Sequence, residues 1–281
     1  MATYSDNDLF IVPDENPHAG DDPAFLSETD AASSTQSLSS TVQNYQYENG
    51  RRYHAFRQGE YAYPNDEKEQ QRLDLHHHIN LLALNGELFR APVKMDRARV
   101  LDLGTGTGIW ASEVADEYPS AEILGTDLSP IQESWVPPNC KFEVDDFESE
   151  WDYKKPFDFI HARNLSGSVR DFPLLLTRIN DNLNNGGWVE ITDFVCYPFS
   201  DDNSLEKAPN ILYWAKLLNE ASTKFGKQLN VAPFYKQWVI EAGFKNVKEE
   251  VYKVCGPLRT IYISYLPTIR SHITLGLRIL K

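Results

Sequence analysis

Residues 100–108 constrain this chain more than any other segment, because an apolar strand there runs directly into three glycines at alternate positions. An acid, Asp127, follows 23 positions after the first of these glycines, Gly104. A glycine-spaced turn after a buried strand, followed by an acid, is typical of a nucleotide-type site at the carboxyl edge of a parallel sheet. A dinucleotide-binding turn would carry its third glycine at position 109, where this chain has Ile109. The spacing therefore favours an S-adenosylmethionine (SAM) site over an NAD site.

The turn has the residue types that the amino-acid end of SAM requires. That end carries a carboxylate and an ammonium near the sulfonium cation, and SAM has no phosphate. Gly104, Gly106 and Gly108 let the backbone approach a ligand closely and adopt positive φ. We expect the amides of this turn, which includes Thr105, and the start of the next helix to bind the carboxylate. Asp102, at the end of the strand, is placed for the ammonium.

Acidic residues also end the next two expected strands. Asp127, followed by Leu128, ends the second strand, where a carboxylate can accept both ribose hydroxyls; capping of the turn that it begins is the alternative. Asp145 and Asp146 end the third strand. One of them can accept from the adenine amino group while Phe147 packs on the ring, and an exposed acidic loop is the alternative. Acids at successive strand ends agree with one adenosine lying across the sheet edge.

From residue 99 onward, apolar strands alternate with single helices. This arrangement predicts right-handed crossovers and a parallel sheet that is covered on both faces. The expected fold class is therefore α/β, with a doubly wound, mostly parallel, Rossmann-like sheet. We expect strands at 99–103, 121–125, 141–144, 157–162, 188–192 and 246–254, helices at 109–118, 172–183, 210–225 and 234–242, and a turn at 184–187. Residues 260–266 are β-branched and aromatic and can supply a seventh, antiparallel strand.

Composition divides the chain into three parts. Residues 1–44 are rich in Ser, Asp, Thr and Pro and are expected to form a disordered acidic tail. Residues 45–98 mix cations with aromatics and contain a helical pattern from Asp66 to about Leu84. We expect this part to form an N-terminal helical lid over the site, with an interaction surface as the alternative. We expect residues 99–281 to form the SAM-binding domain.

Charge and composition argue against several classes of partner. The net charge is −14, and residues 1–50 hold nine acids and no Lys or Arg, so the basic footprint of direct nucleic-acid binding is missing. No run of 18 apolar residues predicts a membrane span. The polar N-terminus does not read as a secretory signal, and three scattered cysteines indicate reduced thiols, so we expect a cytoplasmic location. Adjacent histidines at 76–78 of a helix cannot converge on one metal, and no metal is expected.

Methyl transfer from a sulfonium is an in-line displacement that depends mostly on positioning and exclusion of water. A general base matters only if the acceptor must lose a proton. The candidate bases are His161, at the end of the fourth strand, and Asp193, past the fifth, with packing into the core as the alternative for His161. Arg163 and Asn164 follow His161 and are expected to contact the cofactor. Tyr53 is expected to reach it from the lid.

Eight motifs occur in an order that matches one known family. They are N-G-R-R-Y-H at 49–54, P-N-D-E at 64–67, L-D-L-G-T-G-T-G-I-W at 101–110, G-T-D-L-S-P-I-Q at 125–132, W-V-P-P-N-C at 135–140, F-E-V-D-D at 142–146, F-D-F-I-H-A-R-N-L at 157–165 and G-G-W-V-E at 186–190. In these motifs the chain resembles the fungal LaeA-like SAM-dependent methyltransferases, a class I family. By resemblance, the glycine turn, Asp127 and the pair Asp145 and Asp146 bind SAM.

The resemblance implies O- or N-methylation of a small molecule in fungal secondary-metabolite biosynthesis. The alternative that it implies is a nuclear regulator of secondary-metabolite genes, which binds SAM and acts through a protein partner of the velvet type. A short tail, the lack of a basic nuclear-import cluster and the overall acidity favour the enzyme. The chain departs from the family at Asp193, where a Glu is more common, and after Val254, where the family pattern ends.

Overall fold

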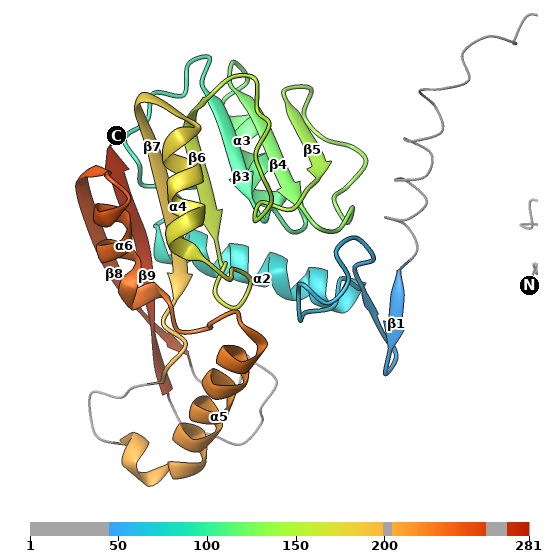
Figure 1. Cartoon of the computed structure of the whole chain (residues 1–281), viewed down its shortest axis with the longest axis vertical. Coiled ribbons are helices and arrows are strands. Elements are labelled where there is room, and N and C mark those ends of the chain that lie inside the picture. The colour runs from blue at the N-terminus through green and yellow to red at the C-terminus, as the bar shows by residue number, and fades with distance from the viewer. Residues whose placement is uncertain (1–44, 199–203, 257–268, 281) are drawn as a thin grey trace, which may run out of the picture. The chain divides into compact units, whose positions relative to one another are not determined.

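The computed structural model describes residues 45–198, 204–256 and 269–280. The expected tail at 1–44 and the expected strand at 260–266 lie outside these residues. A seven-stranded sheet in the order β5-β4-β3-β6-β7-β9-β8 forms the centre of the described part (Figure 1). Its strands are β3 (Arg99–Leu103), β4 (Glu122–Asp127), β5 (Cys140–Val144), β6 (Phe157–Arg163), β7 (Leu183–Phe194), β8 (Lys245–Gly256) and β9 (Ile269–Leu280).

The sheet is parallel from β5 to β7 and antiparallel at β9. β3 is the first strand of this sheet in chain order, and it lies between β4 and β6. The order in which strands are added to the sheet therefore reverses at β3. Ligands of doubly wound sheets bind at the carboxyl ends of the strands beside such a reversal. The prediction of a doubly wound, mostly parallel sheet is confirmed. The antiparallel strand β9 pairs with both β7 and β8, so β8 is not the neighbour of β7.

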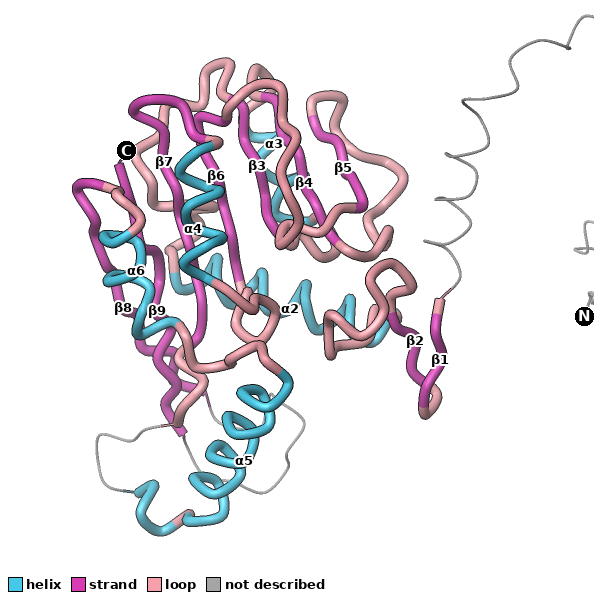
Figure 2. The backbone as a smooth tube through the Cα atoms, in the orientation of Figure 1, coloured by secondary structure: helices cyan, strands magenta, loops and turns pink. Residues whose placement is uncertain are grey.

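Helices cover the sheet on both faces, and one helix crosses its end. Figure 2 shows α4 and α6 on one face, with α3 on the other and α2 running across the carboxyl ends of the parallel strands. The helices are α2 (Glu67–Ala83), α3 (Ile109–Glu117), α4 (Phe172–Asp181), α5 (Pro209–Phe225) and α6 (Tyr235–Glu241), with short 3-10 turns η1 (Ser204–Lys207) and η2 (Ala232–Phe234). Among the described residues, no helix is long and apolar enough to cross a membrane.

Strand alternation divides the core between the two faces. Leu101 and Leu103 of β3 belong to the cluster packed on α4 and α6, whereas Val100 belongs to the cluster packed on α3. Because successive side chains on a strand point to opposite faces, Asp102 shares the α3 face with Val100. The same alternation on β6 puts His161 on the face of Phe159, which also packs in the α3 cluster. Asp102 of β3 and His161 of β6 therefore lie side by side on the face of the sheet that α3 covers.

The N-terminal part contains two short strands that the sequence did not predict, in addition to the expected helix. A hairpin of β1 (Gln46–Glu48) and β2 (Arg51–Tyr53) precedes α2, and its two-residue turn, Asn49 and Gly50, has positive φ at both positions. An Asn-Gly pair is a strong hairpin signal, but strands of three residues are too short to show alternation in the sequence. The start of α2 is as predicted, since the Asp66 side chain accepts a hydrogen bond from the Glu69 N–H.

The expected turn at 184–187 is part of β7. Phe157 pairs with Leu183 and Phe159 pairs with Trp188, so residues 184–187 oppose the single residue Asp158. Gly186, with φ of 83°, takes up this irregularity. The expectation of a turn before the strand is wrong, because these residues form a bulge inside a continuous strand.

Candidate functional site

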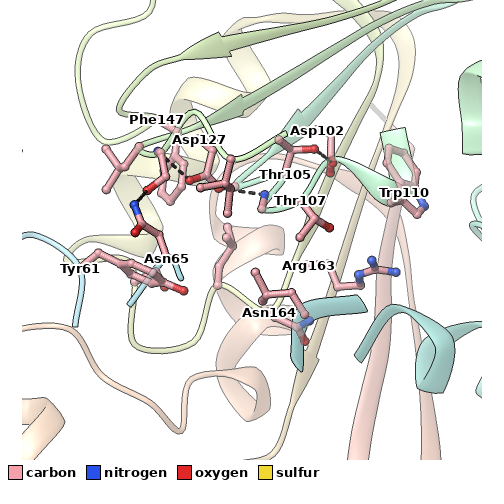
Figure 3. Close-up of a pocket in the computed structure, with 18 of the residues that line it drawn as sticks. Tyr61, Asn65, Asp102, Thr105, Thr107, Trp110, Asp127, Phe147, Arg163 and Asn164 are labelled. Carbon is pink, nitrogen blue, oxygen red and sulfur yellow. Dashed lines mark hydrogen bonds between the residues drawn. The ribbon is translucent and has the colours of Figure 1, made fainter. Parts of the chain in front are cut away.

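A pocket lies at the carboxyl ends of β3, β4 and β6, between the glycine turn and the segment that leads into α2. The empty space within it, including the open solvent at its mouth, is about 1040 Å³. Figure 3 shows Tyr61, Asn65, Asp127 and Phe147 toward one end and Asp102, Thr107, Trp110 and Arg163 toward the other. The other residues of the wall are Pro64, Leu73, Gly104, Thr105, Gly106, Ile109, Leu128, Ser129, Ile131, Asp146, Glu148, His161, Asn164, Leu165, Ser168 and Lys227.

The glycine turn forms the floor of the pocket, and its backbone requires glycine. Gly106 and Gly108 have φ of 60° and 79°, which side chains rarely tolerate. A Cβ at Gly108 would lie 2.5 Å from the Phe142 ring, and a Cβ at Gly106 would lie 3.3 Å from Leu73. The first clash would fall inside the protein and the second on the pocket wall. The turn therefore packs closely on β5 and also leaves its backbone exposed toward the pocket.

Three of the amides in this turn already have acceptors. The Thr105 N–H donates to the Thr126 carbonyl at 2.9 Å, and the Gly108 N–H donates to the Thr105 carbonyl at 3.0 Å. The Gly106 N–H donates to Oδ2 of Asp127 at 2.9 Å. We had expected the amides of this turn to bind a ligand carboxylate. For these three amides that expectation is wrong, because internal hydrogen bonds hold the turn in shape.

Asp127 lies at the tip of β4 and holds two loops together. Besides Gly106, it accepts from the Ser129 N–H, through Oδ1 at 3.0 Å. Burial raises the pKa of Asp127 to about 6, although both hydrogen bonds lower it and the nearby Asp102 raises it further. Each carboxylate oxygen has a second lone pair. Asp127 thus combines the turn-capping role with a carboxylate on the pocket wall that can accept from ligand hydroxyls.

At the other end of the pocket, Asp102 is held by residues from two elements. Its Oδ2 accepts from the Thr105 hydroxyl at 2.6 Å, and its Oδ1 lies 2.7 Å from Nδ1 of His161. The His161 ring stacks on Trp110 with 3.6 Å between ring centroids. Burial lowers the pKa of His161, so the neutral ring donates through Nδ1 to Asp102. This geometry gives His161 a positioning role beneath the glycine turn and agrees with the core-packing alternative.

Arg163 and Asn164 complete this end of the pocket. The Arg163 guanidinium donates through Nη2 to Nδ1 of His77 on α2, at 2.9 Å. Asn164 adopts φ of 58°, and its N–H donates to the Thr192 carbonyl. Its side-chain oxygen Oδ1 is buried and has no hydrogen-bond partner within the described residues. An unpaired buried acceptor on a pocket wall fits a ligand that supplies a donor.

Of the two adjacent acids after β5, only Asp146 reaches the pocket. Its Oδ1 accepts from the Glu148 N–H at 2.9 Å, and Phe147 lies beside it on the wall. Asp145 does not line the pocket, and its Oδ1 accepts from the Asp146 N–H. The sequence placed both acids at the strand end but could not tell which one points inward.

Two other expected site residues lie elsewhere. Tyr53, the last residue of β2, is not on the pocket wall, and Tyr61 from the following segment takes the place expected for it. Asp193 is buried away from the pocket, where its carboxylate accepts from the Tyr235 hydroxyl and from the N–H groups of Ser166 and Phe194, each at 2.8 Å. Burial raises the pKa of Asp193 to about 6. We therefore assign Asp193 to fastening α6 onto the end of the sheet, not to catalysis.

Sequence reasoning missed several residues of the wall. Asn65 donates to the Ser129 hydroxyl at 3.1 Å and so fastens the start of α2 to the loop after β4. Lys227, from the loop after α5, is buried and lies 2.8 Å from Glu148. The motif that contains Asn65 was visible in the sequence, but no local pattern pointed to Lys227, because its partner is 79 positions away.

The pocket fits a ligand that has a nucleoside and a charged amino-acid end. One end offers a carboxylate for hydroxyls and an aromatic ring, Asp127 and Phe147, and the other end offers both signs of charge, Asp102 and Arg163. Asn164, whose buried Oδ1 has no hydrogen-bond partner among the described residues, also lines the pocket. Among the described residues, no group of three His, Cys, Asp or Glu side chains could hold a metal ion.

Comparisons with known proteins agree with this geometry. Residues 69–249 match the model of the family described as "Methyltransferase domain". The chain is 43% identical over 229 residues to methyltransferase pytC of Aspergillus terreus, covering 80% of this chain and 70% of that protein. It is 39% identical over 220 residues to the secondary metabolism regulator LAE1 of Cochliobolus heterostrophus, covering 76% and 72%.

A solved structure supports the fold alone. It is a chain of the complex between the Haloferax volcanii Trm112 methyltransferase activator and a candidate methyltransferase, with a TM-score of 0.51 and 16% identity over 75% of this chain and 95% of that chain. The family match, the sequence relatives and the pocket point to one cofactor, SAM. The chain therefore belongs to the methyltransferase domain family, as a fungal LaeA-like, SAM-dependent methyltransferase of class I.

Proposed function

We propose that this enzyme transfers a methyl group to an oxygen or nitrogen atom of a small molecule in fungal secondary metabolism. The observation that carries this proposal is the enclosure of the pocket by four separate segments. Tyr61 and Asn65 come from the N-terminal part, Leu73 from α2, Leu165 from the loop after β6 and Lys227 from the loop after α5. Walls on so many sides suit a compact acceptor better than an extended polypeptide. The 43% identity to pytC is consistent with this choice.

In this proposal the cofactor lies along the carboxyl ends of β5, β4, β3 and β6, which are neighbours in that order in the sheet. Asp127 accepts from its ribose hydroxyls, and Asp146 and Phe147 hold its adenine. Asp102 accepts from its ammonium, and the Asn164 side-chain oxygen is a second acceptor on the pocket wall. SAM supplies a methyl group bonded to a sulfonium cation, which departs as a neutral thioether. The remaining cofactor residues of the proposal are the turn residues Gly104, Thr105, Gly106 and Gly108, Leu128 of the loop after β4, and Arg163.

The protein contributes mainly by positioning and by exclusion of water. His161 holds Asp102 in place and stacks under Trp110, so its role is to orient the floor of the site. Tyr61 covers the pocket from the N-terminal part, and burial raises its pKa, so its hydroxyl stays protonated. A neutral hydroxyl beside Asp127 can donate without adding a second negative charge to the site.

The second candidate function is regulation of secondary-metabolite genes through a protein partner, with SAM bound in the same pocket. The observation that favours it is the 39% identity to the regulator LAE1 over 76% of this chain. Under this alternative the chain acts in the nucleus, and a velvet-type protein is the expected partner. The net charge of −14 argues against direct contact with nucleic acid in either case.

Deletion of the gene, followed by comparative metabolite profiling, separates the two functions. A small-molecule methyltransferase predicts that one compound accumulates in a form that lacks a methyl group, and that the purified enzyme with SAM converts it to the methylated product. A regulator predicts that many pathways fall silent together and that no single unmethylated precursor accumulates. The second pattern would overturn the proposal of a small-molecule acceptor.

A further inference from the structure

Arg163, the last residue of β6, is a cation without an acidic partner at one end of the pocket. Within the described parts of the chain, no carboxylate oxygen lies within 4.0 Å of its guanidinium, and Nδ1 of His77 is its only hydrogen-bond partner there. Burial lowers the pKa of Arg163, and Asp102 and Glu113 oppose this effect only through space. A guanidinium has five N–H donors, and the contact with His77 uses one of them.

The contact with His77 defines how this histidine is protonated. A guanidinium only donates, so Nδ1 of His77 must accept, and its proton must be on Nε2. Nε2 lies 2.8 Å from Oε2 of Glu113 on α3, and this oxygen accepts the hydrogen bond that Nε2–H donates. Burial and the charge of Arg163 both lower the pKa of His77, so the ring stays neutral. Glu113, His77 and Arg163 thus form a chain of hydrogen bonds from the surface of α3 to the pocket, which we call the Arg163 relay.

The location of Arg163 indicates which chemical group of a ligand it would bind. It lies at the pocket end that also holds Asp102, Thr107 and Trp110 (Figure 3). A charge that is removed from water without a partner is costly, so a ligand that brings an anion here is favoured. The turn amides of Thr105, Gly106 and Gly108, which could have bound an anion, are already engaged. Among the groups of SAM, the carboxylate of the amino-acid end is the anion.

We infer that Arg163 binds the carboxylate of the cofactor's amino-acid end, and that His77, held by Glu113, is the positioning residue that orients its guanidinium. This inference rests on the proposed SAM site and adds to it a residue on α2 that does not line the pocket. A planar guanidinium binds a carboxylate well in only a few orientations, so a fixed partner on one nitrogen favours binding through the others. His77 supplies that partner without adding charge.

The test compares two ligands that share the adenosyl group. S-adenosylhomocysteine (SAH) carries the amino-acid end, whereas 5′-methylthioadenosine lacks it. Dissociation constants of both are measured by calorimetry on the full chain. Arg163→Met should weaken SAH by about 10- to 100-fold, the loss of a charge-assisted contact, and leave 5′-methylthioadenosine within about twofold. Arg99→Met, which removes a half-buried guanidinium at the opposite end of the sheet, is the matched control and should change neither constant.

The role of His77 is tested by a second series. His77→Phe keeps the ring but removes the acceptor, and it should weaken SAH by about 3- to 10-fold without affecting 5′-methylthioadenosine. His77→Asn retains an acceptor atom near the place of Nδ1 and should restore most of the SAH affinity. His78→Gln changes the exposed neighbour on the same helix and is the control. In the free protein, nitrogen NMR should show the His77 proton on Nε2.

The possible outcomes separate this inference from the SAM site itself. If Arg163→Met weakens both ligands equally, or weakens methyl transfer alone, the carboxylate is not bound there and the inference is overturned. A His77 proton on Nδ1, or equal SAH affinity in His77→Phe and wild type, overturns the relay. If wild-type protein binds neither ligand, the proposed cofactor site fails, and the inference fails with it. A selective loss of SAH in both series supports it, and the His77 series still decides if Arg163→Met does not fold.

Discussion

Lowering the pH should weaken cofactor binding through Asp127. The pKa of this carboxyl is raised to about 6 by burial, from an ordinary value of 3.8. Only the ionised form can accept from both ribose hydroxyls while it also holds the N–H groups of Gly106 and Ser129. Near pH 8, Asp127 is therefore ionised in nearly all of the free protein, which can bind SAH. Near pH 5, Asp127 is ionised in only about one-tenth of the free protein. The apparent affinity for SAH should therefore fall about tenfold from pH 8 to pH 5. The charges of SAH itself do not change in this range, so the ligand adds no pH dependence of its own.

Calorimetric titrations with SAH at several pH values test this prediction, with two variants. Asp127→Asn should bind SAH more weakly at pH 8 by about 1–3 kcal/mol, from the loss of charge-assisted hydrogen bonds, and should lose the pH dependence. Asp193→Asn is the matched control, because the pKa of Asp193 is also raised to about 6 but its side chain lies outside the pocket. The reasoning is refuted if wild type and Asp127→Asn show the same pH dependence, or if Asp193→Asn removes it.

Three further predictions concern the supporting structure. Gly108→Ala should lower the free energy of unfolding in urea by about 1–3 kcal/mol more than Gly86→Ala, because the new Cβ meets the Phe142 ring at 2.5 Å whereas the site at Gly86, with a similar φ, is open; equal losses would contradict the packing argument. The raised pKa of Asp193 means that the folded chain holds this proton more tightly than the unfolded chain. The contribution of protonated Asp193 to the free energy of unfolding should thus be fullest below about pH 4 and be lost as the pH rises through about 6. Asp193→Asn should remove this pH-dependent contribution from unfolding curves measured at a series of pH values. Tyr61→Ala should increase the dissociation rate of SAH about tenfold in stopped-flow experiments, if Tyr61 covers the adenosine end; an unchanged rate would argue against a lid.

The sheet could be predicted well because periodicity and strand ends carry its information. The strands β3 and β6 and the helix α3 agree with the expected ranges to within one residue at each end, since β3 ends just before a glycine, α3 begins after one and β6 begins after a proline. The antiparallel strand β9, at 269–280, was not among the strands expected from the sequence, and the strand expected at 260–266 lies outside the described residues. The place of β9 in the sheet depends on its pairing with β7, which is distant in the chain, so no local pattern could locate it.

The site could be predicted only where backbone geometry decides the contact. The glycine turn and Asp127 follow from the order of strand, turn and acid. Asp146 lines the pocket and its neighbour Asp145 does not. Which of two such neighbours faces the pocket depends on how the chain turns after the strand ends. Lys227 joins the wall through long-range packing, and Asp193 is withdrawn from it by hydrogen bonds to α6. Such contacts require the tertiary structure.

The most direct test of this account is a crystal structure of the protein with SAH bound. The account predicts the ribose hydroxyls on the Asp127 carboxylate, the adenine against Phe147 and the amino-acid end toward Asp102, all within the pocket at the ends of β3 to β6. A ligand bound elsewhere, or one bound here with its ribose turned away from Asp127, would contradict it.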